Sequence, residues 1–541
     1  MSALDKELTE HLIKIISETN GITLVDTLEL AAQPEAINDN PTIKRSIRDF
    51  MKLLSSFQQD EMDINTLFSH PVSVALENFF KLFPLPYREE HIHLTGSLSA
   101  EFIFPYLKSL LEGEHKKIYE KKIVSVYGED ALPIETVEDV EKLIRLRDNQ
   151  AFDEYLQILL LPKLILTSRE IHKAAAYHMA SELYHKYNVG MIRLKFTFSR
   201  ASSDKSDQIP GLEEISEEEV VLGLYDGFMQ FKSEVPVFQF VLSPSFRKEE
   251  SFFDNKKFKS KQEHFNYQVD QILDILERHP HLGPYLVDVD TVGNEKDLFR
   301  KGHFQVMRQG FRKLHYKGFA IRSHHGETWH TLKKGVQAVD NSMNIWQIDT
   351  LEHGLSLGIN PNYYFHSLFQ RVVQKNQQGL ALEKGSLDYA EVNDMDWIHN
   401  KSVLAKLNEG EVLTEEEIVY FIKAKFHTAR EVEGYQHDVL NRMIHKKVSL
   451  IALPTSNMKL TGSFPDYKDH PFSWWEKKAV KLGIGTDNYI TLNTNYIKEL
   501  LILLYTDPLN LKITKLLMVA TGEERRPFLS QLLWKMRDKI T

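Results

Sequence analysis

Short apolar runs recur along the chain after about residue 85, and each is followed by a segment with helical spacing of its apolar positions. Eight such runs are rich in β-branched or aromatic residues, near residues 90, 191, 237, 285, 318, 345, 448 and 482. Apolar runs without strict alternation suit strands buried on both faces, and intervening helices favour parallel strands. Eight such units predict an α/β fold, a (β/α)₈ TIM barrel, with its chemistry where the strands end.

The rest of the pattern predicts helices added to this barrel. Residues 1–80 have helical spacing and polar turns, so they are expected to form an N-terminal helical extension, with the barrel in residues 81–541. The predicted strands are unevenly spaced, which places large insertions near 108–165 and 370–440. Both are rich in helix-forming residues and are interpreted as helical additions, not separate domains.

Composition narrows the classes of function. The chain is 42% apolar and 11% aromatic, as is ordinary for a soluble globular protein. A formal charge of −10 without a long basic run argues against a broad nucleic-acid-binding surface, although a local basic pocket could hold one phosphate. No stretch is apolar for long enough to span a bilayer, and the N-terminus is unlike a signal peptide. We therefore expect a cytoplasmic protein without a membrane partner.

The chain has no cysteine, so any metal ion must be held by His, Asp and Glu. The stretch "EHIHL" would place His91 and His93 on the same side of a strand, where they could chelate one ion. Taken alone, this stretch is better explained by two packed or surface histidines. Indeed "HPH" at 279–281 has the same spacing around a proline and is typical of a turn.

Polar residues at three later strand ends favour the metal-site interpretation of His91 and His93. "SHHGE" offers His324 and Glu327, "LEHG" offers His353, and "GTDN" offers Asp487 and Asn488. Each motif is weak alone: His353, for example, has the pattern of an ordinary core histidine. Together, four strand-end motifs in barrel order predict one shared site.

These motifs resemble those of the metal-dependent adenosine and AMP deaminase family. The matching elements are His-x-His-x-x-Gly at 91–96, His-x-Gly-Glu at 324–327, His-Gly at 353–354, "LPTSN" at 453–457 and Thr-Asp at 486–487. The resemblance covers about residues 85–510 and leaves the N-terminal extension and both insertions unmatched. It implies hydrolytic removal of the amino group of adenosine, deoxyadenosine or their 5′-phosphates.

The resemblance also implies a role for each motif. One Zn²⁺ per subunit would be held by four ligands: His91, His93, His324 and Asp487. Such an ion lowers the pKa of bound water from about 15.7 to about 7. Glu327 would donate a proton to purine N1, which requires burial to raise its pKa. His353 would hydrogen-bond the attacking water and help take its proton. The N–H of Gly293 would reach purine N3, although a turn glycine is the ordinary reading.

Two departures from the family pattern concern the substrate. Asn488 stands where an aspartate usually contacts purine N7, and its amide could donate the same hydrogen bond. Thr95 replaces an aspartate that reaches the ribose 5′-hydroxyl in nucleoside-specific members. Without that charge, ATP, dATP or AMP become candidate substrates. Arg322, Lys459 and Arg200 are candidate phosphate partners, and each is alternatively a solvated surface charge.

The unusual size and extra helices also resemble the deaminase components of RADAR-type phage-defence systems. That resemblance implies a homo-oligomer formed through the helical additions, and a partner protein from the defence system.

Two other functions remain open. One is a different barrel amidohydrolase with a single metal ion, because a binuclear site would need a bridging lysine, which "YLVDVDTVG" does not offer. A non-catalytic, metal-stabilised scaffold that senses nucleotides would need none of the acid–base groups.

Overall fold

Eight parallel strands form a closed barrel in the computed structural model, which describes residues 3–33, 40–147, 150, 152–198, 209–212, 214–461 and 466–540. The strands pair in chain order from β1 to β8, and a parallel bridge between Ile92 and Asp487 joins the last strand to the first. The predicted α/β barrel is confirmed. The strands are β1 (Tyr87–His93), β2 (Val189–Phe196), β3 (Gln239–Arg247), β4 (Asp288–Val292), β5 (Ala320–His325), β6 (Thr350–His353), β7 (Ser449–Ala452) and β8 (Leu482–Ile484).

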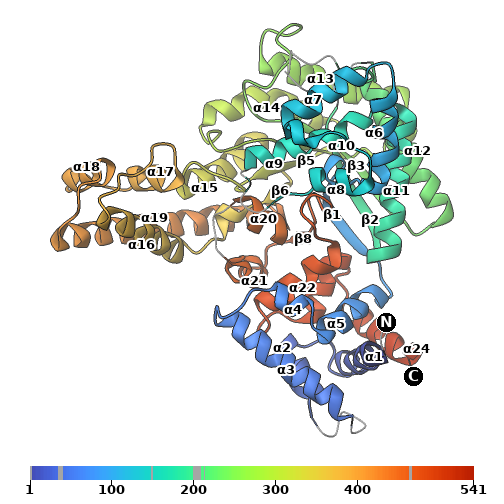
Figure 1. Ribbon diagram of the computed structural model, residues 1–541, viewed down its shortest axis with the longest axis horizontal. Helices are drawn as coiled ribbons and strands as arrows, with labels where there is room; N and C mark the ends of the chain where they lie inside the picture. Colours follow the sequence, from blue (N-terminus) through green and yellow to red (C-terminus); the bar gives the residue numbers. More distant parts are fainter. Residues whose placement is uncertain are drawn as a thin grey trace.

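Helices before β1 and the last helices of the chain, from α21 (Phe472–Lys477) on, lie together on one side of the barrel (Figure 1), where the two ends of the chain meet. Their apolar side chains belong to the same hydrophobic core as those of the barrel, so the N-terminal extension is packed on it. The N-terminal helices are α1 (Ala3–Glu18), α2 (Leu24–Ala31), α3 (Pro41–Gln58), α4 (Asn65–Phe68) and α5 (Pro71–Leu82). The C-terminal helices are α20 (Pro454–Thr461), α21 (Phe472–Lys477), α22 (Tyr496–Thr506), α23 (Ile513–Thr521) and α24 (Arg526–Ile540).

The insertion between β1 and β2 is helical. Its helices are α6 (Ala100–Glu112), α7 (Lys116–Tyr127), α8 (Val137–Ile144), α9 (Phe152–Ile158) and α10 (Leu160–Ile165), and α11 (Arg169–Tyr187) leads back to the barrel. In a small apolar cluster, Tyr155 of α9 packs with Leu460 and Leu492 from the C-terminal part of the chain. This contact fixes the insertion near the end of β8.

The insertion between β6 and β7 forms an arm that extends away from the barrel (Figure 1). It consists of α16 (Pro361–Gln377), α17 (Leu387–Asp394), α18 (Lys401–Glu409) and the long α19 (Glu415–His445). Its buried apolar side chains, including Phe365, Leu368 and Phe421, form a second core. The remaining helices connect the middle strands: α12 (Glu217–Glu234), α13 (Lys261–Arg278), α14 (Lys301–Tyr316) and α15 (Leu332–Asn341).

A buried carboxyl group joins this arm to the barrel helices. Glu391 of α17 is 2% exposed and accepts hydrogen bonds from the Leu332 N–H at the start of α15 and from the Tyr364 hydroxyl. Burial raises the pKa of Glu391 to about 8, with a further increase from the Asp394 charge. Folding of the arm therefore favours the protonated form of Glu391.

We expect Glu391→Gln to reduce the pH dependence of stability. A carboxyl group whose pKa is higher when folded than when unfolded costs nothing below the unfolded pKa of about 4.5, and its cost grows as pH rises to about 8. The glutamine variant should match wild type near pH 4.5 and melt several degrees higher near pH 9, as measured by calorimetry. A constant difference in melting temperature across this range would contradict this assignment.

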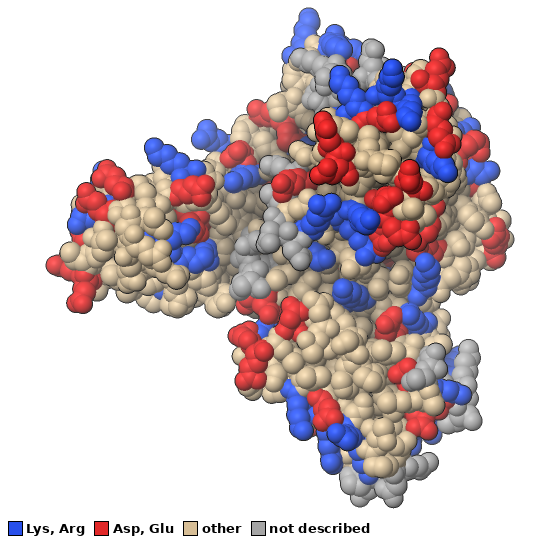
Figure 2. All heavy atoms as spheres, in the orientation of Figure 1, with Lys and Arg blue, Asp and Glu red and all other residues tan. Residues whose placement is uncertain are grey.

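Charges of both signs are interspersed over the face of the molecule shown in Figure 2, where Lys and Arg alternate with Asp and Glu on the described surface. None of the described helices combines the length and apolarity needed to cross a membrane.

Candidate active site

Three imidazole nitrogens and a carboxylate oxygen converge where β1, β5 and β8 end. The Nε2 atom of His93 lies 3.1 Å from Nε2 of His91 and 3.2 Å from Nε2 of His324. The Oδ1 atom of Asp487 lies 3.4 Å from Nε2 of His93 and 3.7 Å from Nε2 of His91. The barrel thus brings together the four residues that the sequence predicts as ligands.

The side chains form two groups that could each hold a metal ion, one of His91, His93 and His324 and one of His91, His353 and Asp487. Donors 2.0–2.1 Å from Zn²⁺ in tetrahedral geometry stand about 3.3 Å apart, close to the separations of 3.1, 3.2, 3.4 and 3.7 Å. Burial lowers the pKa of His93 to about 3 and that of His324 well below its ordinary value. Neutral rings leave their lone pairs available for a metal. The donor set therefore fits the expected ion, and its identity stays a prediction.

Carboxylates hydrogen-bond to the Nδ1 atoms of His91 and His324, which makes the Nε2 atoms of these rings acceptors. The Nδ1 atom of His91 lies 2.7 Å from Glu352, and Nδ1 of His324 lies 3.0 Å from Asp290. A carboxylate only accepts, so both rings carry their proton on Nδ1 and direct an Nε2 lone pair into the cluster. Lys195 lies 2.9 Å from both carboxylates and is fully buried. No sequence motif predicted these three supporting residues.

The segment "LPTSN" contributes two more residues that support the site, a role that its sequence did not predict. The Ser456 hydroxyl donates to Oδ2 of Asp487 at 2.6 Å, which leaves Oδ1 facing the histidines. Asn457 Oδ1 lies 2.9 Å from Nδ1 of His353, so that nitrogen donates its proton to the amide oxygen. The Nε2 atom of His353 is buried and has no hydrogen-bond partner among the described residues.

Glu327 stands beside His353 on the loop after β5. Its Oε1 atom lies 3.7 Å from Nε2 of His353. Glu295 accepts hydrogen bonds from the backbone N–H groups of Gly326, Glu327 and Thr328 and holds this loop in place. Burial raises the pKa of Glu327 to about 7, which is the direction that a proton donor requires.

Two of the candidate residues have backbone conformations that are uncommon for side chains with a Cβ atom. His353 has φ +66° and Asp487 has φ +63°, both in the left-handed region. Such conformations cost free energy and persist where the surrounding contacts hold them, as at functional sites. Here a hydrogen bond donated by Ser456 holds Asp487, and a hydrogen bond accepted by Asn457 holds His353.

A cavity of about 360 Å³ opens beside the cluster. Its lining includes the predicted site residues His93, Thr95, Gly293, His324, Glu327, Asp487 and Asn488. The insertion between β1 and β2 contributes an apolar wall of Phe152, Tyr155, Leu156, Leu159 and Leu160. Gly293 has φ +105°, and a Cβ atom there would lie 2.3 Å from Glu249, so glycine is required.

The two described candidates for a phosphate site, Arg322 and Lys459, do not line this cavity. Arg322 is buried in ion pairs with Glu352 and Glu90, and Lys459 donates to the Leu492 carbonyl. Arg200 lies outside the described residues. The cations that line the cavity are Lys122, Lys163 and Arg247. Two of them come from the insertion, whose placement over the barrel could not be read from strand periodicity.

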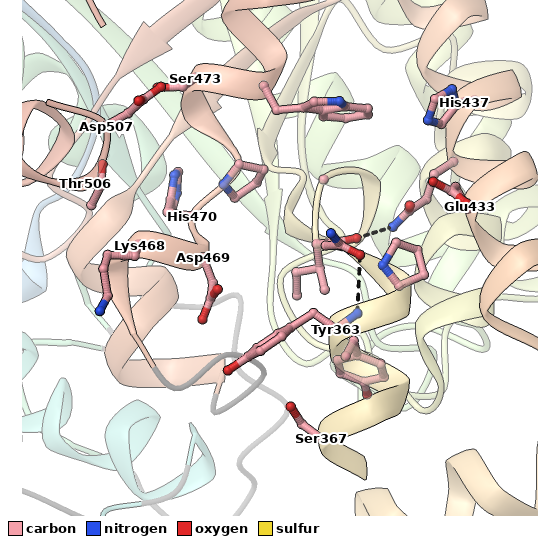
Figure 3. A pocket seen from close by; sticks show the side chains of 18 of the residues that line it. Tyr363, Ser367, Glu433, His437, Lys468, Asp469, His470, Ser473, Thr506 and Asp507 are labelled. Atoms are coloured by element: carbon pink, nitrogen blue, oxygen red, sulfur yellow. Dashed lines mark hydrogen bonds between the residues drawn. The ribbon is translucent and has the colours of Figure 1, made fainter. Parts of the chain in front are cut away.

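A larger cavity of about 910 Å³ lies elsewhere, between the arm and helices α21 and α22 (Figure 3). Tyr363 and Ser367 of α16, His437 of α19 and Asp469 face it. None of the predicted site residues lines it. Its wall nevertheless includes His470, whose Nε2 lies 3.2 Å from Nδ2 of Asn457, the residue that supports His353.

Comparison with family models and with curated proteins finds no match to this sequence. Three solved structures with a similar fold are an adenine deaminase from Arthrobacter aurescens, an amidohydrolase from Burkholderia ambifaria with bound Zn, and the N6-methyl-AMP deaminase from Arabidopsis thaliana. Their identities are 11%, 12% and 13%, and their TM-scores 0.48, 0.47 and 0.46. The matches cover 84%, 86% and 85% of this chain and 99%, 94% and 98% of the others. At this level of similarity, the chemistry has to be argued from the site residues themselves.

Proposed function

We propose that this chain is a zinc-dependent hydrolase that removes the C6 amino group of adenosine, deoxyadenosine or their 5′-phosphates and releases ammonia. One observation carries the proposal: the four-residue donor set, Glu327 and His353 lie together at the ends of barrel strands. Hydrolytic deamination needs a nucleophile at neutral pH, a proton acceptor and a proton donor.

His353, Glu327 and Gly293 have separate roles in the proposed reaction. A bound Zn²⁺ would supply acidity to water at neutral pH. The lone pair on Nε2 of His353 is directed to accept a proton from the attacking water, because Asn457 holds the ring proton on Nδ1. Glu327, kept protonated by burial, donates to N1 of the purine as negative charge develops there. The N–H of Gly293 is the proposed donor to N3.

The cations of the cavity support a phosphorylated substrate. Thr95 contributes no negative charge to this wall, while Lys122, Lys163 and Arg247 contribute positive charge. Lys122 and Lys163, which line the cavity from the insertion between β1 and β2, are the proposed phosphate partners. The proposal thus favours 5′-phosphates over the bare nucleoside.

Substituting both lysines should separate phosphate binding from chemistry. We expect Lys122→Ala/Lys163→Ala to raise KM for AMP by roughly 10- to 100-fold, as for loss of charge-assisted hydrogen bonds, and to change KM for adenosine little. Lys116→Ala, an exposed residue on the same insertion, is the matched control. Equal changes for AMP and adenosine in the double variant would contradict the assignment.

The reaction itself is tested by ultraviolet absorbance, since conversion of adenine to hypoxanthine shifts the spectrum. Adenosine, deoxyadenosine, AMP, ATP and dATP are compared with and without chelator. Turnover that a chelator abolishes supports the proposal. No turnover of any member would overturn it and favour the scaffold, and hydrolysis of other amides would favour a different barrel amidohydrolase. A role in phage defence, a partner protein and a homo-oligomer remain predictions from the sequence.

A further inference from the structure

Tyr155 enters the candidate active site from the insertion that the family resemblance leaves unmatched. It lies on α9, is 3% exposed and lines the same cavity as Glu327 and Asp487. Its ring packs against Leu460 and Leu492, so the side chain is held in place from behind. The position of its hydroxyl group is therefore set by the fold.

The hydrogen bond between Asn488 and Tyr155 has a defined direction. Asn488 Nδ2 lies 2.7 Å from Oδ1 of Asp487, and a carboxylate oxygen only accepts, so the amide nitrogen must face this side. The same Nδ2 donates to the hydroxyl oxygen of Tyr155. Both amide hydrogens of Asn488 are thus used within the protein.

The amide oxygen of Asn488 is not directed at the cavity either. It lies against Gly96, where a Cβ atom would be 1.7 Å away from it, and it has no hydrogen-bond partner among the described residues. Asn488 consequently presents neither its donor nor its acceptor to a substrate. The sequence-based expectation had it donate directly to purine N7.

The phenol of Tyr155 retains one donor. A phenolic oxygen that accepts from Asn488 must direct its own hydrogen elsewhere, and it donates to none of the described residues. Burial raises the pKa of Tyr155 well above its ordinary value, and the Asp487 and Glu327 charges add to the shift, so this hydrogen is retained at neutral pH. The cavity is where a ligand atom could accept it.

We propose that Tyr155 donates a hydrogen bond to N7 of the adenine ring and is a specificity-determining residue of this site. The inference rests on the proposed function. Glu327 follows β5 and is the proposed donor to N1. Asn488 follows β8, three strands away around the barrel, and Tyr155 of α9 lies beside it. In adenine, N1 and N7 lie on either side of the C6 amino group. Donors at these two strand ends could therefore each reach one of the two nitrogens.

Replacing N7 by carbon in the substrate tests this contact. Wild type and Tyr155→Phe are compared on adenosine and 7-deazaadenosine, each as nucleoside and as 5′-phosphate. We expect Tyr155→Phe to lower kcat/KM for the adenine compounds by roughly 10- to 100-fold and to leave the 7-deaza compounds within about threefold of wild type. An equal loss for both rings would overturn the proposal, because it would mean that the hydroxyl acts through the protein alone.

Two further measurements make the result unambiguous. Tyr119→Phe, which removes a hydroxyl that donates to the Pro210 carbonyl in the same insertion, should change no ring preference. Calorimetric binding of adenosine and 7-deazaadenosine to zinc-loaded Glu327→Gln protein, with and without Tyr155→Phe, measures the contact without turnover. If wild type deaminates no compound, the proposed function fails, and the contact still stands if Glu327→Gln binds adenosine more tightly than 7-deazaadenosine and the double variant does not. Equal binding of the two nucleosides by Glu327→Gln would overturn the proposed contact.

Discussion

Glu327→Gln should lower kcat by about 10²- to 10⁴-fold, the usual contribution of a general acid, while metal content and melting temperature change little. Glutamine keeps the size of the side chain and can still accept hydrogen bonds, but it cannot transfer a proton. The Glu327 backbone remains held by Glu295, so the loop should keep its position. Steady-state kinetics on the best adenine substrate, together with metal analysis, measures both sides of this expectation.

The matched control is Glu250→Gln. Glu250 lies after β3, and its side chain is 49% exposed. This variant should retain full activity. Activity of Glu327→Gln near that of wild type would contradict its role as proton donor. Loss of metal together with activity would show that the residue acts on the donor set instead.

Removal of two predicted ligands, by His91→Ala/His93→Ala, should abolish both metal binding and deamination. An ion bound only by the folded state stabilises it by about 4 kcal/mol at a free concentration 1,000 times Kd, so added Zn²⁺ should raise the melting temperature of wild type but not of this variant. Glu352 keeps its contacts with Lys195 and Arg322, so the buried carboxylate stays compensated in the variant. Metal analysis by mass spectrometry and calorimetric melting with added Zn²⁺ are the measurements.

The chain contains its own control for this experiment. His279 and His281 have the same spacing as His91 and His93, but His279 precedes a short 3₁₀ turn, His281 lies within it, and His279 pairs with Glu218. His279→Ala/His281→Ala should keep metal content, response to Zn²⁺ and activity. Loss of zinc in this variant, or its retention in His91→Ala/His93→Ala, would contradict the assigned donor set.

The sequence determined the barrel and the order of the residues at its strand ends. Strands buried on both faces leave continuous apolar runs, and parallel strands end at the same edge, so local patterns were sufficient to place His91, His324, His353 and Asp487 near one another. The absence of cysteine limited the ligand types in the same direct way.

Only the tertiary structure decided which groups support and surround that site. His91 pairs with Glu352 across 261 positions, Asn457 supports His353 across 104, and Asn488 meets Tyr155 across 333. The same holds for the cations: Arg322 is buried among carboxylates, while Lys122 and Lys163 reach the cavity from an insertion. Periodicity reports on near neighbours in the chain, whereas these contacts depend on how the barrel closes and where its insertions pack.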